Sequence, residues 1–135
     1  MTVAAPLPEN RPLTADEVAL VRWLLKHGYP DAPGFLPRLA DAWVVSRCPC
    51  GCASIDFSVG GVVPPAGAKM HTLADYQWQA ADGAQFGVFV FTRGGLLAGL
   101  EVWSMDGLAA ASVLPKIEQL QPLVFSQSAA PGTSS

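Results

Sequence analysis

The stretch QFGVFVFTRGGLLAGLEVWSM, from Gln85 to Met105, predicts the centre of the fold. Its first part, QFGVFVFTR, is apolar on both faces, which is typical of a strand inside a sheet. The pair Gly94-Gly95 then predicts a two-residue hairpin turn, because glycine readily adopts the positive φ angles of such turns. The second part, LLAGLEVWSM, returns as an antiparallel strand and ends before an Asp-Gly pair.

Three other segments have the β-branched or alternating pattern of strands: AWVVSRC at 42–48, ASIDFSV at 53–59 and HTLADYQWQA at 71–80. The intervening GGVVPPAGA is predicted to be a loop, since two prolines do not both fit into the interior of a sheet. With the central hairpin, these segments predict an antiparallel β-meander of about five strands.

The segment LTADEVALVRWLLKHG, residues 13–28, predicts the main helix. Thr14 and Glu17 have the spacing of a capping box, and Gly28 is placed to end the helix. Four apolar residues at helical spacing form one stripe: Val18, Val21, Leu24 and Leu25. A short second helix is expected from Leu36 to Ala40. The prediction is therefore an α+β fold in which both helices pack on one face of the meander.

The two ends of the chain differ in composition from the part between them. Residues 1–12 contain three prolines and predict an extended Pro-rich arm. Residues 126–135 are small and polar, which predicts a disordered tail. The length of 135 residues fits one domain, so residues 13–125 are expected to form a single α+β domain.

The composition narrows the classes of partner. Half of the residues are hydrophobic and only 14% are charged, which favours burial of surface against a second copy or another protein. A net charge of −3 without a basic run argues against nucleic acid and anionic membranes. No apolar run approaches the roughly 18 residues that cross a bilayer. The N-terminus lacks the pattern of a signal peptide, so a cytoplasmic location is expected.

The stretch RCPCGC contains all three cysteines of the chain, Cys48, Cys50 and Cys52. The first interpretation is a hairpin turn, in which Pro49 fixes φ, Gly51 supplies a positive φ and the cysteines are compact hydrophobic residues. This interpretation does not explain why three cysteines are present.

The alternatives use the chemistry of the thiols. Three thiolates favour zinc or copper(I), and zinc would need a fourth ligand such as His71, His27 or a carboxylate. A redox role would use a strained, easily reduced disulfide between Cys48 and Cys50. The order of preference from the sequence is turn, then metal, then redox.

Several charged residues are weaker candidates. Arg47 and Asp56 flank the cysteine loop and are expected to make a diagonal contact at most. Glu101 interrupts an apolar strand, and is either an acid with a shifted pKa or part of a wet outer face. Asp75 lies beside Tyr76 and Trp78 in an alternating segment. These residues either line a ligand cleft or, as is more common for alternating aromatic residues on a strand, belong to the core of the sheet.

Several catalytic patterns are missing from the sequence. It has no Gly-rich phosphate turn between strand and helix, no pair of metal-binding histidines on a helix and no nucleophile elbow. Catalysis is therefore less expected than binding.

The stretches VVSRCPCGCASIDF and GGLLAGLEVWSMDG resemble a group of small bacterial proteins of unknown function. In that group a helix precedes an Arg-Cys-x-Cys-Gly-Cys segment, and a later strand reads Gly-Leu-Glu-aromatic or similar. The resemblance covers most of the segment from Thr14 to Leu120. It implies a stand-alone cytoplasmic domain and assigns no role to the cysteines.

Two functional hypotheses result. The first is a small cytoplasmic interaction module that self-associates or binds another protein and holds no cofactor. The alternative is a metal-binding or redox protein centred on Cys48, Cys50 and Cys52, with zinc or copper as the metal and His71 as a further ligand.

Overall fold

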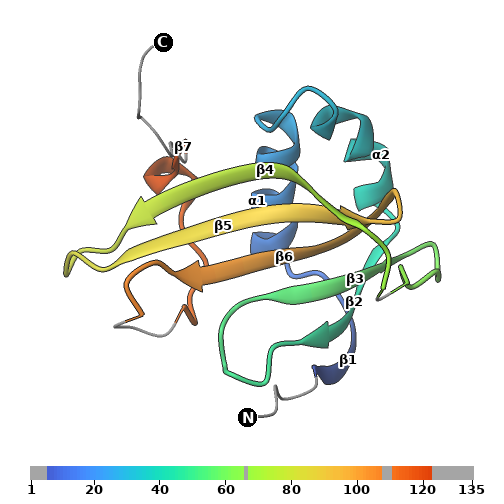
Figure 1. The fold of residues 1–135 in the computed structure, drawn as a ribbon, viewed down its shortest axis with the longest axis horizontal. Helices are drawn as coiled ribbons and strands as arrows, with labels where there is room; N and C mark the ends of the chain where they lie inside the picture. The colour runs from blue at the N-terminus through green and yellow to red at the C-terminus, as the bar shows by residue number, and fades with distance from the viewer. Residues whose placement is uncertain (1–5, 66, 108–110, 123–135) are drawn as a thin grey trace.

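The computed structural model describes residues 6–65, 67–107 and 111–122. Within them the chain forms one antiparallel sheet of seven strands in the order β1-β2-β3-β6-β5-β4-β7 (Figure 1). The strands are β1 (Leu7–Pro12), β2 (Ala42–Arg47), β3 (Ile55–Val59), β4 (Met70–Gln79), β5 (Gln85–Arg93), β6 (Leu96–Ser104) and β7 (Gln121–Pro122). The helices are α1 (Ala15–Lys26) and α2 (Leu36–Leu39), and 3-10 turns lie at Ala32–Phe35 and Ile117–Gln119.

The α+β class and the antiparallel sheet are confirmed, but the prediction of about five strands was too low. The two additional strands are β1, which comes from the Pro-rich arm, and the two-residue β7, which pairs with β4. Strands β4, β5 and β6 form a meander. Strand β3 pairs with β2 on one side and with β6 on the other, and not with β4, the next strand along the chain. The predicted disordered tail, residues 126–135, lies outside the described residues.

The capping box of helix α1 is present as the sequence predicts. The Thr14 hydroxyl accepts a hydrogen bond from the Glu17 amide at 3.1 Å, and the Glu17 carboxylate accepts one from the Thr14 amide at 2.9 Å. After the helix, Gly28 lies so close to β4 that a Cβ there would be 2.3 Å from the Leu73 carbonyl oxygen. Gly28 is therefore required by this close approach to the sheet.

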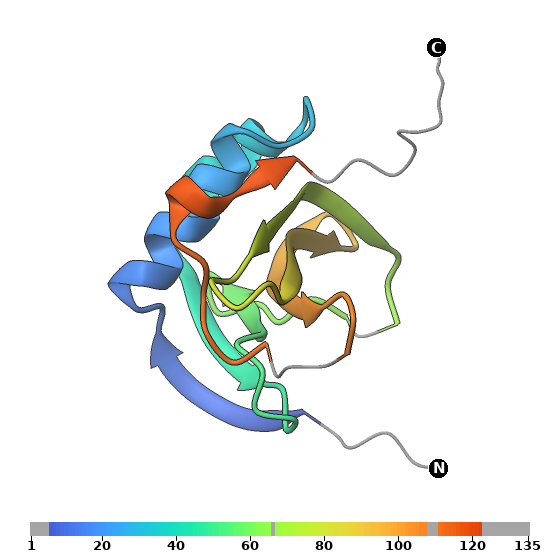
Figure 2. The same cartoon turned by 90° about the vertical axis from the view of Figure 1, so that its left-hand side faces the viewer.

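Both helices lie on the same side of the sheet (Figure 2). The buried stripe of α1 packs against β4 and β5. It meets the alternate, inward side chains of the strands, among them Val44, Phe57, Val88, Val90, Leu100 and Val102. Because side chains alternate along a strand, Phe89, Phe91 and Glu101 point to the other face.

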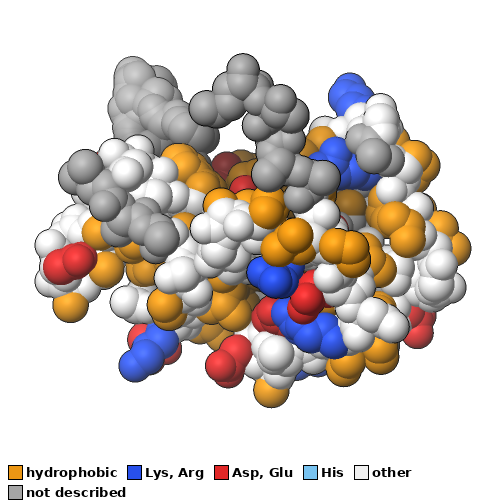
Figure 3. Space-filling view, turned by 90° about the horizontal axis from the view of Figure 1, so that it is seen from below, with side chains coloured by type: hydrophobic (Ala, Val, Ile, Leu, Met, Phe, Trp, Pro, Cys, Tyr) orange, Lys and Arg blue, Asp and Glu red, His pale blue; other side chains and the backbone are white. Residues whose placement is uncertain are grey.

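Strand β1 is held to the rest of the domain by ion pairs. The Arg11 guanidinium contacts the Glu17 carboxylate of α1 at 2.9 Å, and Glu9 contacts Arg47 of β2 at 3.2 Å. Seen from below, the molecule has basic and acidic side chains next to one another near the middle of the face (Figure 3). Burial disfavours the charged form of Glu17, but hydrogen bonds from Arg11 and Thr14 hold the pKa of its carboxyl below the ordinary value.

The pairing of β3 with β6 joins the two halves of the sheet through only two residue pairs, Ile55 with Leu100 and Asp56 with Gly99. Ser54 extends the contact, because its hydroxyl donates to the Val102 carbonyl at 3.1 Å and accepts from the Val102 amide at 2.8 Å. A Cβ on Gly99 would lie 2.7 Å from the Ile55 carbonyl oxygen and 2.8 Å from Phe91 Cζ. Position 99 therefore has no room for a side chain.

We expect Gly99→Ala to lower the free energy of unfolding by about 2 kcal/mol or more, because the added methyl group would push β3 away from β6. The matched control is Gly34→Ala, since a Cβ at Gly34 meets nothing within 4 Å. That control should stay within about 0.5 kcal/mol of wild type. Urea denaturation followed by circular dichroism measures both variants. Equal stabilities for the two would contradict the assigned role of Gly99.

Candidate functional site

The cysteine segment is the loop of the β2–β3 hairpin. Gly51 has a φ of 89°, as the turn interpretation requires, and its amide donates to the Cys48 carbonyl at 3.4 Å. At the end of the loop, the Ala53 amide donates to the Ala111 carbonyl at 2.8 Å. The loop is therefore shaped by backbone hydrogen bonds and by one glycine.

The loop brings the three thiols together. The Sγ atoms of Cys48, Cys50 and Cys52 all lie within 4.8 Å of one another. A tetrahedral ion with Zn–S bonds of about 2.3 Å separates its sulfur ligands by roughly 3.8 Å, so movements on the order of 1 Å would complete a three-sulfur site. Cys50 is exposed and the other two are half-buried.

The thiols perturb one another electrostatically. Hydrogen bonds from Cys48, Cys52 and nearby backbone lower the pKa of Cys50, and the Cys52 amide lies 3.3 Å from its sulfur. Burial raises the pKa of Cys48 to about 12, and its role as hydrogen-bond donor to Cys50 adds to the shift. The loop thus favours negative charge at Cys50.

The histidines proposed as fourth ligands lie elsewhere. His71 is on β4, which β5 and β6 separate from β3, and its Nε2 is 2.8 Å from the Asp31 carboxylate. His27 is stacked on Trp23 with ring centroids 4.2 Å apart. Among the described residues, the group of candidate ligand atoms consists of the three cysteine sulfurs.

The charged residues that flank the loop have separate partners. Arg47 is opposite Ile55, one of the two registers expected from the sequence. Its guanidinium contacts Glu9 at 3.2 Å, and Asp56 accepts a hydrogen bond from Ser46 at 2.7 Å. The expected diagonal contact between Arg47 and Asp56 is not among the ion pairs of the described residues.

A row of side chains crosses the sheet face opposite the helices. Asp75 is opposite Phe89, and Phe89 is opposite Glu101. Burial raises the pKa of both carboxyl groups, and the nearby Asp56 charge adds to the shift of Glu101. The hypothesis that Glu101 has a shifted pKa thus agrees with its surroundings. Tyr76 and Trp78 pack with the core on the helix side, so they do not form a cleft with Asp75.

The next residue pair on this face of β5 and β6, Gly87 and Trp103, was not predicted from the sequence to be in contact. Gly87 is opposite Trp103, and a Cβ on Gly87 would lie 2.5 Å from the Trp103 indole, which covers the glycine. A glycine inside a strand pattern was the available signal, since it marks a close approach. Within the described part of the chain, Trp103 Nε1 and Asp75 Oδ1 are buried and have no hydrogen-bond partner.

Comparisons with known proteins found no matching family model, no matching curated protein and no matching solved structure. The resemblance to the bacterial Arg-Cys-x-Cys-Gly-Cys group therefore stays a prediction, as does self-association. None of the described helices is long and apolar enough to span a membrane.

The raised pKa of Asp75 has a consequence for stability. The folded protein holds this proton at pH values where the unfolded chain has released it, so wild type loses stability as pH rises from the ordinary aspartate pKa through the raised one. The Asp75→Asn variant has no carboxyl at this position, so it does not lose stability in this way as the pH rises. We therefore expect the stability of Asp75→Asn relative to wild type to increase between about pH 3 and pH 7.

Urea denaturation at several pH values measures this difference, with the exposed Asp41→Asn as the matched control. A stability difference between Asp75→Asn and wild type that does not change with pH would show that burial does not perturb this carboxyl.

Proposed function

We propose that this protein binds a thiophilic metal ion through Cys48, Cys50 and Cys52. The observation that carries the proposal is the convergence of three sulfurs within 4.8 Å on a loop of seven residues between β2 and β3. A turn alone needs Pro49 and Gly51 but does not need three thiols. All three sulfurs lie close to one another, an arrangement that suits a common ion better than a single disulfide.

The donor set narrows the choice of metal. Thiolates are soft ligands that select copper(I) and zinc over magnesium or calcium. Three thiolates can surround copper(I), whereas four-coordinate zinc would take water or another ligand in its remaining position. Because His71 pairs with Asp31, we do not assign it to the site.

The surroundings of the loop favour reversible binding, in which the metal ion exchanges with metal in solution. Cys50 is exposed, so an ion can enter and leave without unfolding of the domain. The hydrophobic core is built from the helix and the inward side chains of the strands, and among the cysteines only Cys52 packs against it. The fold therefore does not depend on the ion in the way that a small zinc finger does.

We expect protein purified without chelator, or reconstituted under reducing conditions, to hold about one zinc or copper(I) ion per chain. Cys48→Ser, Cys50→Ser and Cys52→Ser should each reduce the metal affinity by at least about tenfold. His71→Gln is the matched control and should bind as wild type does. Elemental analysis and competition with a chromogenic chelator give these values. Wild-type protein that binds neither metal would contradict the proposal.

The turn and the metal site make separate contributions to stability. In the metal-free protein, Gly51→Ala should lower the free energy of unfolding by about 1 kcal/mol, because alanine is strained at a φ of 89°. Cys50→Ser should change it by less than about 0.5 kcal/mol. Adding metal should stabilise wild type but not Cys50→Ser. Urea denaturation with and without chelator measures these effects, and a Cys50→Ser variant stabilised equally by metal would contradict the assigned ligand.

A further inference from the structure

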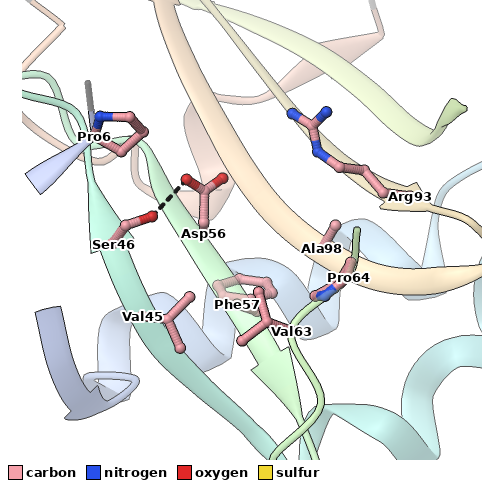
Figure 4. A pocket seen from close by; sticks show the side chains of 9 residues that line it. All are labelled: Pro6, Val45, Ser46, Asp56, Phe57, Val63, Pro64, Arg93 and Ala98. Carbon is pink, nitrogen blue, oxygen red and sulfur yellow. Dashed lines mark hydrogen bonds between the residues drawn. The ribbon is translucent and has the colours of Figure 1, made fainter. Parts of the chain in front are cut away.

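Two adjoining cavities lie beside the β2–β3–β6 part of the sheet, with volumes of about 370 Å³ and 220 Å³. Both are lined by Pro6, Asp56 and Arg93, so the two cavities are neighbours, and together they are called the groove. Figure 4 shows the larger cavity, where Asp56 and Arg93 come from different strands, β3 and β5. Sites for small molecules typically have volumes of about 300–1,000 Å³, so the groove suits a small molecule.

The groove contains charged groups of both signs. The Arg93 guanidinium lies over the Phe91 ring, 5.2 Å from its centroid, and Asp56 is oriented by the Ser46 hydroxyl at 2.7 Å. Glu101 lines the smaller cavity together with Asp56 and Arg93. Burial raises the pKa of the Glu101 carboxyl, the Asp56 charge adds to this shift, and the Arg93 charge opposes it.

These charges are unequal in number. Two carboxylates, Asp56 and Glu101, line the groove with one guanidinium, Arg93, while the second arginine of the smaller cavity, Arg47, pairs with Glu9. A ligand with a positive group would therefore balance the second carboxylate. The guanidinium has five N–H donors and can bind a ligand carboxylate in addition to its other contacts.

The rest of the larger cavity is apolar. Val45 of β2, Ala98 of β6 and the loop residues Val63 and Pro64 line it around the charged groups (Figure 4). Val63 is 60% exposed, although it is a large hydrophobic residue. A ligand with an apolar side chain would cover it and gain the free energy of burying apolar surface.

We propose that this groove binds a free α-amino acid with an apolar side chain. The ligand's ammonium group contacts Asp56 and Glu101, its carboxylate contacts Arg93, and its side chain packs against Val63 and the neighbouring apolar wall. A simple amine would leave the guanidinium without a ligand carboxylate, and a simple carboxylate would add negative charge beside two carboxylates. A zwitterionic amino acid has an ammonium group for the two carboxylates and a carboxylate for the guanidinium.

Calorimetric titration of the reduced, unaltered protein with L-leucine tests the proposal. We expect saturable binding with one site per chain. L-leucinamide lacks the carboxylate, N-acetyl-L-leucine lacks the ammonium group and glycine lacks the side chain, so each should bind at least about tenfold more weakly. Failure of leucine to bind at concentrations on the order of 10 mM, or equal binding of leucine and its analogues, would overturn the proposal.

Substitutions then test which side chains contact leucine. Arg93→Gln and Asp56→Asn should each weaken leucine binding by at least about tenfold. Arg38→Gln and Asp41→Asn are matched controls at exposed positions outside the groove and should bind as wild type does. Near-ultraviolet circular dichroism checks that each variant is folded. Unchanged affinity in folded Arg93→Gln or Asp56→Asn would place leucine elsewhere and overturn the assignment.

Discussion

The short contact between β3 and β6 is the constraint on which the rest of the structure depends. It joins β1-β2-β3 to β6-β5-β4-β7 through two residue pairs and the hydroxyl of Ser54. The absence of a side chain at Gly99 permits the contact, since the Ile55 carbonyl and the Phe91 ring occupy the space around its Cα. Because Asp56 is paired with Gly99 and Glu101 is two residues further along β6, this contact also places the carboxylates of the groove.

The cysteine loop and the groove are neighbours because both adjoin this contact. The loop leads into β3, and Cys48 lines the smaller cavity together with Glu101 and Arg93. The helices occupy the other side of the sheet, where α1 covers the core. One face of the sheet therefore packs against the helices, and the other carries Asp75 and Glu101 together with Phe89 and Phe91.

The edges of the sheet limit how two copies could associate. Unpaired strand edges invite pairing with another chain unless prolines, charges or short length prevent it. Strand β1 contains two prolines and carries Glu9 and Arg11, and β7 has only two residues. Self-association, which the apolar composition predicts, would therefore use side chains on a face of the domain rather than a continuation of the sheet.

The sequence by itself determined the local elements. The capping box at Thr14, the Gly94-Gly95 hairpin and the pattern of β5 and β6 depend on interactions between residues close together in the chain, so their signals are readable without tertiary contacts. The three cysteines were equally evident, but their convergence was not, because it depends on the path of the loop backbone around Gly51.

Only the tertiary structure decided which strands are neighbours and which distant side chains meet. The pairing of β3 with β6 and the recruitment of the arm as β1 depend on contacts between segments far apart in sequence. The exclusion of His71 from the thiol group has the same cause, since its strand lies three positions from β3 in the sheet order. Asp56 and Glu101 were separate, weaker candidates along the chain, and Arg93 was not singled out. They form a groove because three separate strands bring them together, and strand order is not encoded in local periodicity.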